Sequence, residues 1–309
     1  MGERRGGPGR ARRRPGARGD DAGRHPAVTA ALRVGTYNLW VAHWPATATY
    51  DRLPLVRAAL DHVDVLGTQE GTRAHLAALT DGTGFAALGR SRDGDGSGEH
   101  AAILYRPERV AVLATGDFWL SPTPEVPSTG WDARFRRLCT WARLRDRATG
   151  STFAVLNAHL DHEGARARRE SARLLLARAA EVGGGGPVVL TGDLNAAPGS
   201  EPLRVLLGGP AAGGARAGGG DSPGVALVDA RAASATPPTG PSTTFTELLD
   251  PDGPAPGPEA VRQRIDHVLV TPDVTVEAYA VLDARPGGRH PSDHDPVVAT
   301  LQLPAPPTP

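Results

Sequence analysis

The chain has 309 residues, of which 39% are hydrophobic and 22% charged, and no apolar run approaches the roughly 18 residues of a membrane span. Its 34 basic residues, all of them arginine, balance 34 acidic residues, which excludes a protein that binds nucleic acid through its overall charge. The single cysteine, Cys139, excludes an internal disulfide and a zinc site built on several cysteines, and it is compatible with the cytoplasmic monomer that we expect.

Residues 1–31 form the first segment, with eight arginines in the first 25 positions, together with glycine and proline. Such a segment cannot bury enough apolar surface to offset the entropy of ordering, so we predict a disordered tail. It has no apolar stretch typical of a secretory signal. An arm that contacts nucleic acid or an anionic surface, or an upstream start codon, are the alternatives.

The folded part is predicted to span residues 32–303. Its first half reads as a strand over 32–40, a helix over 54–62, a strand over 63–70 and a short helix over 73–79. A loop over 91–98 follows, and then strands over 101–105 and 110–113. Residues 115–137 contain three prolines and two tryptophans and are predicted to be irregular.

The second half begins with a predicted hairpin of strands over 138–144 and 152–157. An amphipathic helix over 164–181 follows, and the glycines at 183–186 end it. Strands are predicted over 187–190, 265–270, 274–281 and 297–303. Gly-, Ala- and Pro-rich stretches at 208–224 and 250–260 are predicted to be surface loops, and residues 304–309 a frayed tail. The spacing of the strands fits both hairpins and βαβ units, which predicts a mixed α/β fold.

Several of these strands end in the same way, with an amide, carboxylate or imidazole side chain after an apolar run. The residues are Asn38, Gln69, Glu70, Asn157, His159, Asp193, Asn195, Asp266, His267, Asp293 and His294. Each of them alone is typical of a turn or a helix cap. Together they are costly to bury unless they serve one another or a cation. We therefore predict one metal-dependent site, because hydrolysis of a phosphate ester needs both a cation and a proton-transferring group.

The motifs at these positions resemble those of the endonuclease/exonuclease/phosphatase superfamily, which includes deoxyribonucleases and abasic-site endonucleases. The matching segments are TYNLW (36–40), GTQE (67–70), GEHAAILYR (98–106), LNAHLDH (156–162), TGDLN (191–195), RIDHVLV (264–270) and PSDHDPV (291–297). The resemblance covers about residues 32–303. It is closer still to an uncharacterised bacterial branch that shares FWLS (118–121), GWD (130–132), LCTWARL (138–144) and LDHEGARARRESARLLL (160–176).

The resemblance implies a four-layer α/β sandwich, in which two mixed, mostly antiparallel sheets pack face to face and helices flank them. It also implies that Glu70 is the principal ligand of a Mg²⁺ or Mn²⁺ ion, with Asn38 and Asp293 close by. Such an oxygen-rich set suits Mg²⁺. Asp193 would activate the attacking water, and Asn195 would hold the phosphate or Asp193.

The same resemblance assigns the imidazoles. His294 would bind the scissile phosphate and assist proton transfer, and Asp266 would accept its other N–H. His159 would be a second imidazole at the phosphate. Glu99 would orient His159, and Asn157 would support the site.

Neighbouring residues have two readings each. Asp161 and His162 either face the site or begin the connection to the next helix. Trp119 and Trp131 either stack a base or sugar or form a small core of their own, and Arg134, Arg136 and Arg137 either grip a second phosphate or are solvated. We expect His267 to pack under the sheet, His100 and His290 to lie at the surface or rim, Asp295 to pair structurally, and Cys139 to be buried without a function.

These observations predict a metal-dependent phosphoric ester hydrolase that acts on a mono- or diester. A nuclease is the first alternative, and the balanced charge disfavours it relative to an enzyme that hydrolyses a sugar phosphate or a nucleotide. A non-catalytic binding module is the alternative of another class. It predicts loss of Glu70, Asp193 or His294, and the sequence has all three.

Overall fold

The computed structural model describes residues 1–2, 31–40, 51–208, 225–247 and 261–306. Most of the predicted N-terminal tail, most of the two predicted surface loops and the last three residues of the predicted C-terminal tail lie outside these residues. Within the described part, no helix combines the length and apolarity needed to cross a membrane.

The first sheet has six strands in the order β13-β14-β1-β2-β4-β3. They are β1 (Leu32–Asn38), β2 (Val65–Gly71), β3 (Ala86–Leu88), β4 (His100–Tyr105), β13 (Thr275–Val281) and β14 (Val297–Gln302). β1 and β2 run parallel, and the other neighbours are antiparallel. This sheet joins the two ends of the folded chain, because β1 lies between β2 and the last strand.

The second sheet also has six strands, in the order β5-β6-β7-β8-β12-β9. They are β5 (Val110–Trp119), β6 (Leu138–Asp146), β7 (Thr152–His159), β8 (Val188–Asp193), β9 (Val228–Asp229) and β12 (Asp266–Val270). Only the pair of β7 and β8 is parallel. A separate two-stranded ribbon pairs β10 (Phe245–Thr246) with β11 (Arg262–Gln263).

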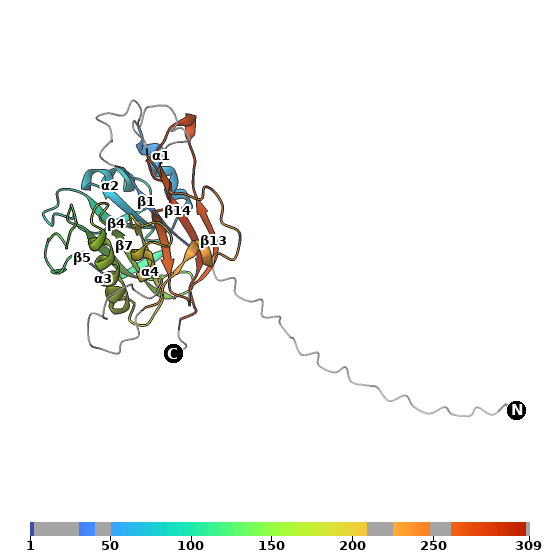
Figure 1. Ribbon diagram of the computed structural model, residues 1–309. Coiled ribbons are helices and arrows are strands. Elements are labelled where there is room, and N and C mark those ends of the chain that lie inside the picture. Colours follow the sequence, from blue (N-terminus) through green and yellow to red (C-terminus); the bar gives the residue numbers. More distant parts are fainter. Residues whose placement is uncertain (3–30, 41–50, 209–224, 248–260, 307–309) are drawn as a thin grey trace.

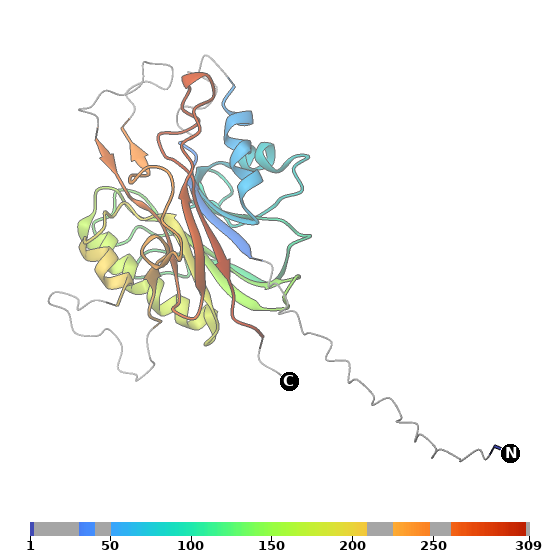
Figure 2. The same cartoon turned by 90° about the vertical axis from the view of Figure 1, so that its right-hand side faces the viewer.

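Helices cover the outer faces of the two sheets, as Figures 1 and 2 show. One side carries α1 (Leu53–Arg57), the 3-10 helix η2 (Ala58–His62) and α2 (Arg73–Thr80), which pack on the first sheet. The other side carries α3 (Ala165–Gly183) and α4 (Glu201–Leu206), which pack on the second. The short helices α5 (Ala230–Ala233) and η3 (Pro286–Gly288) complete the set. This arrangement confirms the predicted four-layer sandwich.

The space between the sheets is apolar over most of its extent, with valines and leucines from both inner faces. Near the end that carries the site it becomes polar, and Asn157 is the centre of that polar layer. Its amide donates to the carbonyls of Thr68 and Ala102 in the first sheet, each at 2.9 Å. Its Oδ1 accepts from Gln69 at 2.8 Å and from Thr191 at 3.1 Å. The close approach requires a glycine at Gly67, where a Cβ would overlap Asn157 Oδ1.

Two predicted elements differ from the structure. The predicted helix over 54–62 is α-helical only to Arg57 and continues as the 3-10 helix η2. The predicted irregular segment 115–137 begins as a strand, because β5 runs on to Trp119. A bulge between Val112 and Ala114 and an exposed stretch at 113–115 interrupt the alternation there, so the pattern does not reveal the strand.

Candidate active site

The strand register gathers predicted site residues at one end of the second sheet. His159, the last residue of β7, lies beside Asp193, the last residue of β8. Asp266, the first residue of β12, lies beside Asp193 on its other side. Three side chains from distant parts of the chain therefore meet because their strands end at the same level.

The first sheet ends at the same place. Asn38 is the last residue of β1, and Glu70 lies next to the end of the parallel strand β2. Asp293 and His294 precede β14, and the backbone of this segment pairs with Phe245 and Thr246 of the ribbon. The hydroxyl of Ser292 donates to the carbonyl of Asn38 at 2.8 Å and so ties the two segments together.

Asp193 is the centre of the site and is almost completely buried. Its Oδ2 accepts from Asn38 Nδ2 at 3.0 Å and lies 3.4 Å from Nε2 of His159 and 3.7 Å from Nε2 of His294. Its Oδ1 accepts the backbone N–H of Asn195 at 3.0 Å. One carboxylate oxygen is thus shared by an amide and two imidazoles, whereas the other is fixed by the backbone.

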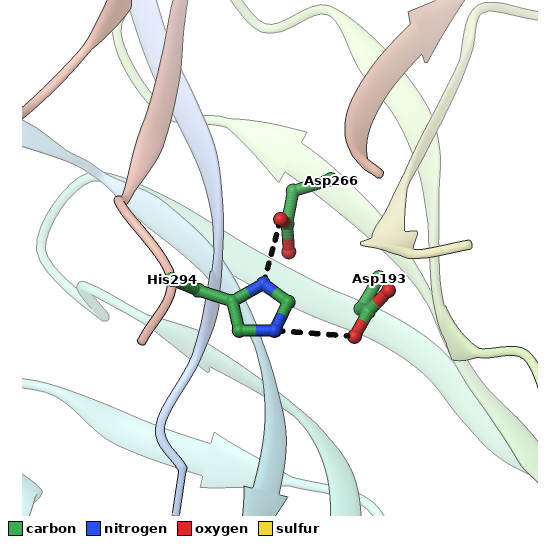
Figure 3. A group of neighbouring side chains, drawn as sticks. All are labelled: Asp193, Asp266 and His294. Carbon is green, nitrogen blue, oxygen red and sulfur yellow. Dashed lines mark hydrogen bonds and ion pairs between the residues drawn. The ribbon is translucent and has the colours of Figure 1, made fainter. Parts of the chain in front are cut away.

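His294 is held from behind by Asp266, as Figure 3 shows. Its Nδ1 donates to Asp266 Oδ2 at 2.7 Å, which leaves Nε2 directed at Asp193. The hydroxyl of Thr244 donates to the same oxygen of Asp266 at 2.7 Å. The ring of Phe245 lies 5.0 Å from the imidazole. These contacts fix the orientation of His294 and keep its Nδ1 protonated.

The electrostatic surroundings of His294 and His159 shift the pKa values of the two imidazoles in opposite directions. Burial alone would lower the pKa of His294, but the charges of Asp266 and Asp193 outweigh it and raise the pKa well above its usual value. Burial and the charges of Arg137 and His294 lower the pKa of His159 well below its usual value. These shifts favour the cationic form of His294 and the neutral form of His159, which both lie next to the carboxylate of Asp193.

Burial has a different effect on two carboxyl groups of the site, because it raises their pKa values. Burial raises the pKa of Asp193. Burial, opposed by the charge of His294 and reinforced by the charges of Glu70 and Asp193, raises the pKa of Asp293 to about 7. Carboxylates whose pKa values rise because they are crowded and desolvated are a natural environment for a divalent cation, which would restore their charged forms. The donor set at Glu70 and Asp293 thus fits Mg²⁺ or Mn²⁺.

Among the described residues, Asp193, Asp266 and His294 also have ligand atoms within 4.8 Å of one another. However, Nδ1 of His294 and Oδ2 of Asp266 are already hydrogen-bonded to each other. We therefore interpret these three residues as groups that transfer protons and not as metal ligands. Asn38 lies close to the carboxylates, as predicted. Its amide nitrogen orients Glu70 at 3.1 Å and Asp193, and its Oδ1 accepts the N–H of Trp40.

Backbone strain is concentrated at the same place. Of the residues that the structure describes, four other than glycine have positive φ, and Trp40, Glu70 and Asn195 among them lie in or beside the site, at 48°, 65° and 43°. Such conformations cost about 1–3 kcal/mol each and persist only where the surroundings impose them. The strained backbone at Glu70 aims its carboxylate at Asn38 and the other acidic groups.

Three predicted site residues have contacts that define their roles. Asn195 turns its side chain to the carbonyl of Leu160, so it holds Asp193 through its backbone N–H and not through its amide. Asn157 supports the site from the polar layer between the sheets. Glu99 forms an ion pair with Arg92 at 2.6 Å, and the described residues record no hydrogen bond between Glu99 and His159.

Most of the residues that neighbour the predicted site in the sequence make structural contacts. Asp161 begins the connection to α3, because it accepts the N–H groups of Glu163 and Gly164 and pairs with Arg137. His267 packs under the sheet, with Nε2 on the carbonyl of Ala196 at 2.9 Å. Asp295 pairs with Arg285, and Trp119 packs in a small core with Ala101 and Leu138. His100 is not at the surface, because it is buried with its Nδ1 on the carbonyl of Gly71, but it lines a small cleft together with Glu70 and His159.

Sequence reasoning missed two residues that support Asp266 and His294. Thr244 binds Asp266, and no local pattern marks it, because it follows a polar stretch of the chain. Ser292 accepts the N–H of His294 at 3.1 Å, and its position inside the PSDHDPV motif is the signal that identifies it.

Comparison with known proteins adds independent findings. A family model described as the Endonuclease/Exonuclease/phosphatase family matches residues 35–294. A structure of an endonuclease/exonuclease/phosphatase from Bacteroides vulgatus is 29% identical, with a TM-score of 0.74, and covers 89% of this chain and 100% of its own. A mannosyl-6-phosphatase from Bacteroides thetaiotaomicron is 31% identical, with a TM-score of 0.71, and covers 88% of this chain and 100% of its own.

A more distant structure is that of D. rerio TDP2 in complex with a single-strand DNA product. It is 20% identical, with a TM-score of 0.64, and covers 88% of this chain and 99% of its own. At this identity the similarity concerns the fold alone. Among curated proteins, no sequence matches this chain.

Proposed function

The chain belongs to the Endonuclease/Exonuclease/phosphatase family, and we propose that it is a Mg²⁺- or Mn²⁺-dependent hydrolase of a small-molecule phosphate ester. The observation that carries the proposal is the environment of Asp193, whose Oδ2 lies within 3.7 Å of the Nε2 atoms of both His159 and His294. A buried carboxylate between a cationic and a neutral imidazole suits water activation next to a bound phosphate.

The chain's own residues divide the chemistry among them. Asp193 takes a proton from the attacking water, and its raised pKa makes it a stronger base than a solvated carboxylate. Cationic His294 contacts the phosphate through Nε2 and stabilises the charge of the in-line transition state. Asp266 holds His294 cationic and oriented. Neutral His159 provides a second hydrogen bond at the phosphate.

Glu70 and Asp293 would hold the metal ion, with Asn38 orienting Glu70. When bound, the ion neutralises charge on the phosphate oxygens. The carboxylate whose pKa rises to about 7 supports this assignment, because burial beside other acidic groups leaves Asp293 in need of a cation.

Two observations favour a small substrate. The chain has no net charge, whereas a nuclease that follows a phosphate backbone is served by an excess of basic residues. The B. thetaiotaomicron structure at 31% identity carries the description of a mannosyl-6-phosphatase. A hexose 6-phosphate is therefore the first substrate to try.

The test is a hydrolysis screen with Mg²⁺, with Mn²⁺ and with a chelator. It sets mannose 6-phosphate beside p-nitrophenyl phosphate, bis-p-nitrophenyl phosphate and single-stranded DNA, with Asp193→Asn as the inactive control. We expect metal-dependent release of phosphate from the sugar phosphate. Activity on DNA alone would make the protein a nuclease, and no activity on any ester with either metal would refute the proposal.

A further inference from the structure

Phe135 is a large apolar side chain that remains 38% exposed at the edge of the candidate active site. Arg92 and Arg137 contact its ring, with guanidinium carbons 5.0 and 5.8 Å from the ring centroid. The same two arginines line a small cleft together with Glu70 and His159. Phe135 therefore lies one side chain away from the groups that would bind metal and phosphate.

The segment that carries Phe135 is fixed in place. The Asp132 carboxylate accepts the N–H groups of Arg166 and Ala167 at the start of α3. The backbone N–H of Phe135 donates to Asp161 at 3.3 Å, two residues beyond His159. Trp131 adopts a φ of 51°, which is a strained conformation for a bulky residue. These contacts fix the loop that carries the Phe135 ring.

His162 extends the aromatic surface. Its imidazole stacks on Phe135 with the ring centroids 5.8 Å apart and an angle of 29° between the planes. Arg137 lies 3.1 Å from His162 Nδ1, where it can donate only to an unprotonated nitrogen. Half of the His162 side chain is exposed. Two rings thus border the site, with the exposed Arg134 and Arg136 on either side of Phe135 in the chain.

The charged groups around these rings are largely balanced. Arg92 pairs with Glu99 at 2.6 Å, Arg136 with Asp93 at 3.1 Å and Arg137 with Asp161 at 3.4 Å. Arg134, which contacts the Phe135 ring at 5.9 Å, forms no ion pair with the other described residues. The surface offers both donors and acceptors beside an aromatic face. A polyanionic strand would be served better by arginines without carboxylate partners.

On the basis of the proposed phosphoesterase activity, we propose that Phe135 and His162, with the flanking Arg92–Glu99 and Arg136–Asp93 pairs, form the subsite for the leaving alcohol. We propose further that this alcohol is a sugar ring. The C–H face of a pyranose packs on an aromatic ring, and its hydroxyls need donors and acceptors together. Phe135 is thereby a specificity-determining residue, and it has no part in the chemistry at phosphorus.

The experiment compares kcat/KM for mannose 6-phosphate, adenosine 5′-monophosphate and the ring-free glycerol 1-phosphate. The variants are Phe135→Ala, Phe135→Leu and Phe135→Trp. Val126→Ala, which shortens another exposed apolar residue of the same segment, is the control. Thermal unfolding checks that each variant is folded.

We expect Phe135→Ala to lower kcat/KM for mannose 6-phosphate about tenfold, mostly through KM, as loss of an aromatic contact predicts. Glycerol 1-phosphate should change less than about twofold, because only the ring makes the contact. Phe135→Trp should restore the activity, whereas Phe135→Leu, which has no planar face, should not. Val126→Ala should behave as the wild type.

Equal losses on the sugar phosphate and glycerol 1-phosphate, or no loss on either, would overturn the subsite. A larger loss on adenosine 5′-monophosphate than on mannose 6-phosphate would overturn the sugar assignment and point to a nucleobase. A wild-type protein that hydrolyses none of the three, nor p-nitrophenyl phosphate, would instead refute the proposed function on which the subsite rests.

Discussion

The first sheet brings the amide nitrogen of Asn38 and the carboxylates of Glu70 and Asp293 to the site, whereas the second brings His159, Asp193 and Asp266. The first set is characterised by crowded acidic groups that suit a cation. A carboxylate between imidazoles, suited to proton transfer, characterises the second. His294 joins the two sets, because it precedes a strand of the first sheet and is bonded to Asp266 of the second.

Because the two sets come from different sheets, the site depends on how the two sheets are placed relative to one another. Neither set is complete alone, and a shift of one sheet would separate His294 from Asp266 and Asn38 from Asp193. The polar layer around Asn157 fixes this placement, because its four hydrogen bonds connect β7 with strands of the first sheet and with β8. Substitutions in the first set, in the second set and in the polar layer should therefore affect different properties, namely metal binding, catalysis and stability.

The largest effect is expected for Asp193→Asn in the second sheet. The amide keeps the shape of the carboxylate but cannot accept a proton, so kcat should fall by about a thousandfold. Steady-state kinetics on the best substrate of the screen measure this, with circular dichroism to verify the fold. A variant that retains more than about a tenth of the activity would remove Asp193 from its role as the base.

The polar layer is tested by Asn157→Ala. The change removes four buried hydrogen bonds and leaves a cavity between the sheets, which should cost about 3 kcal/mol of unfolding free energy. Chemical denaturation measures the loss. Gln302→Ala, which removes a half-buried amide paired with Glu277 at the edge of the molecule, should cost less than about 0.5 kcal/mol. Equal losses in the two variants would contradict a special role for the layer.

The link between the sheets is tested by Asp266→Asn. We expect kcat to fall by about 10- to 100-fold with little change in KM. The charge of Asp266 raises the pKa of His294, so the imidazolium persists to higher pH in the wild type. Removal of that charge should move the alkaline limb of the pH–rate profile to lower pH. Asp295→Asn, next to His294 but paired with Arg285, should leave the limb in place.

The smallest effect concerns Asp161, behind the second sheet. Burial opposes its ionisation, but bonds from the backbone N–H groups of Gly164, Arg134 and Phe135 and the charge of Arg137 lower its pKa to about 2. A carboxylate with a lowered pKa stabilises the fold at pH values above about 4 and loses this effect as the pH falls toward 2. The contribution is at most about 2 kcal/mol.

Acid unfolding of Asp161→Asn measures that contribution. Between pH 6 and pH 2 the variant should lose less stability than the wild type, with the difference confined to the region below about pH 4. Asp61→Asn, on the exposed side of η2, is the matched control and should follow the wild type. Parallel pH curves for Asp161→Asn and the wild type would show that the carboxylate has no such role.

Much of this architecture could be predicted because its signals are local. Apolar runs that end in polar residues marked the ends of β1, β7 and β8, and the polar pair before an apolar run marked the start of β12. Parallel and antiparallel pairing brings these residues together. The amphipathic pattern and the glycines after it located α3, which ends at Gly183 and is capped by Gly184 with a φ of 57°. The family resemblance supplied the four-layer arrangement, which patterning alone could not distinguish from other mixed α/β folds.

What could not be predicted depends on contacts between distant residues. The pairing of β5 with β6 extends that strand through a bulge, and no periodicity shows it. His100 is buried only because the backbone of Gly71 lies beside it. Thr244 binds Asp266 from a segment without any motif, and Glu99 is paired with Arg92, seven residues away, so the sequence suggested a different partner.

We propose that residues of the first sheet hold a metal ion and residues of the second sheet move a proton. Calorimetric titration of the wild type, Glu70→Gln and Asp193→Asn with Mn²⁺ distinguishes these two roles. We expect Glu70→Gln to weaken Mn²⁺ binding at least about tenfold, whereas Asp193→Asn should bind within about threefold of the wild type although it is inactive. Equal affinities for Glu70→Gln and the wild type, or an equal loss in both variants, would contradict the division.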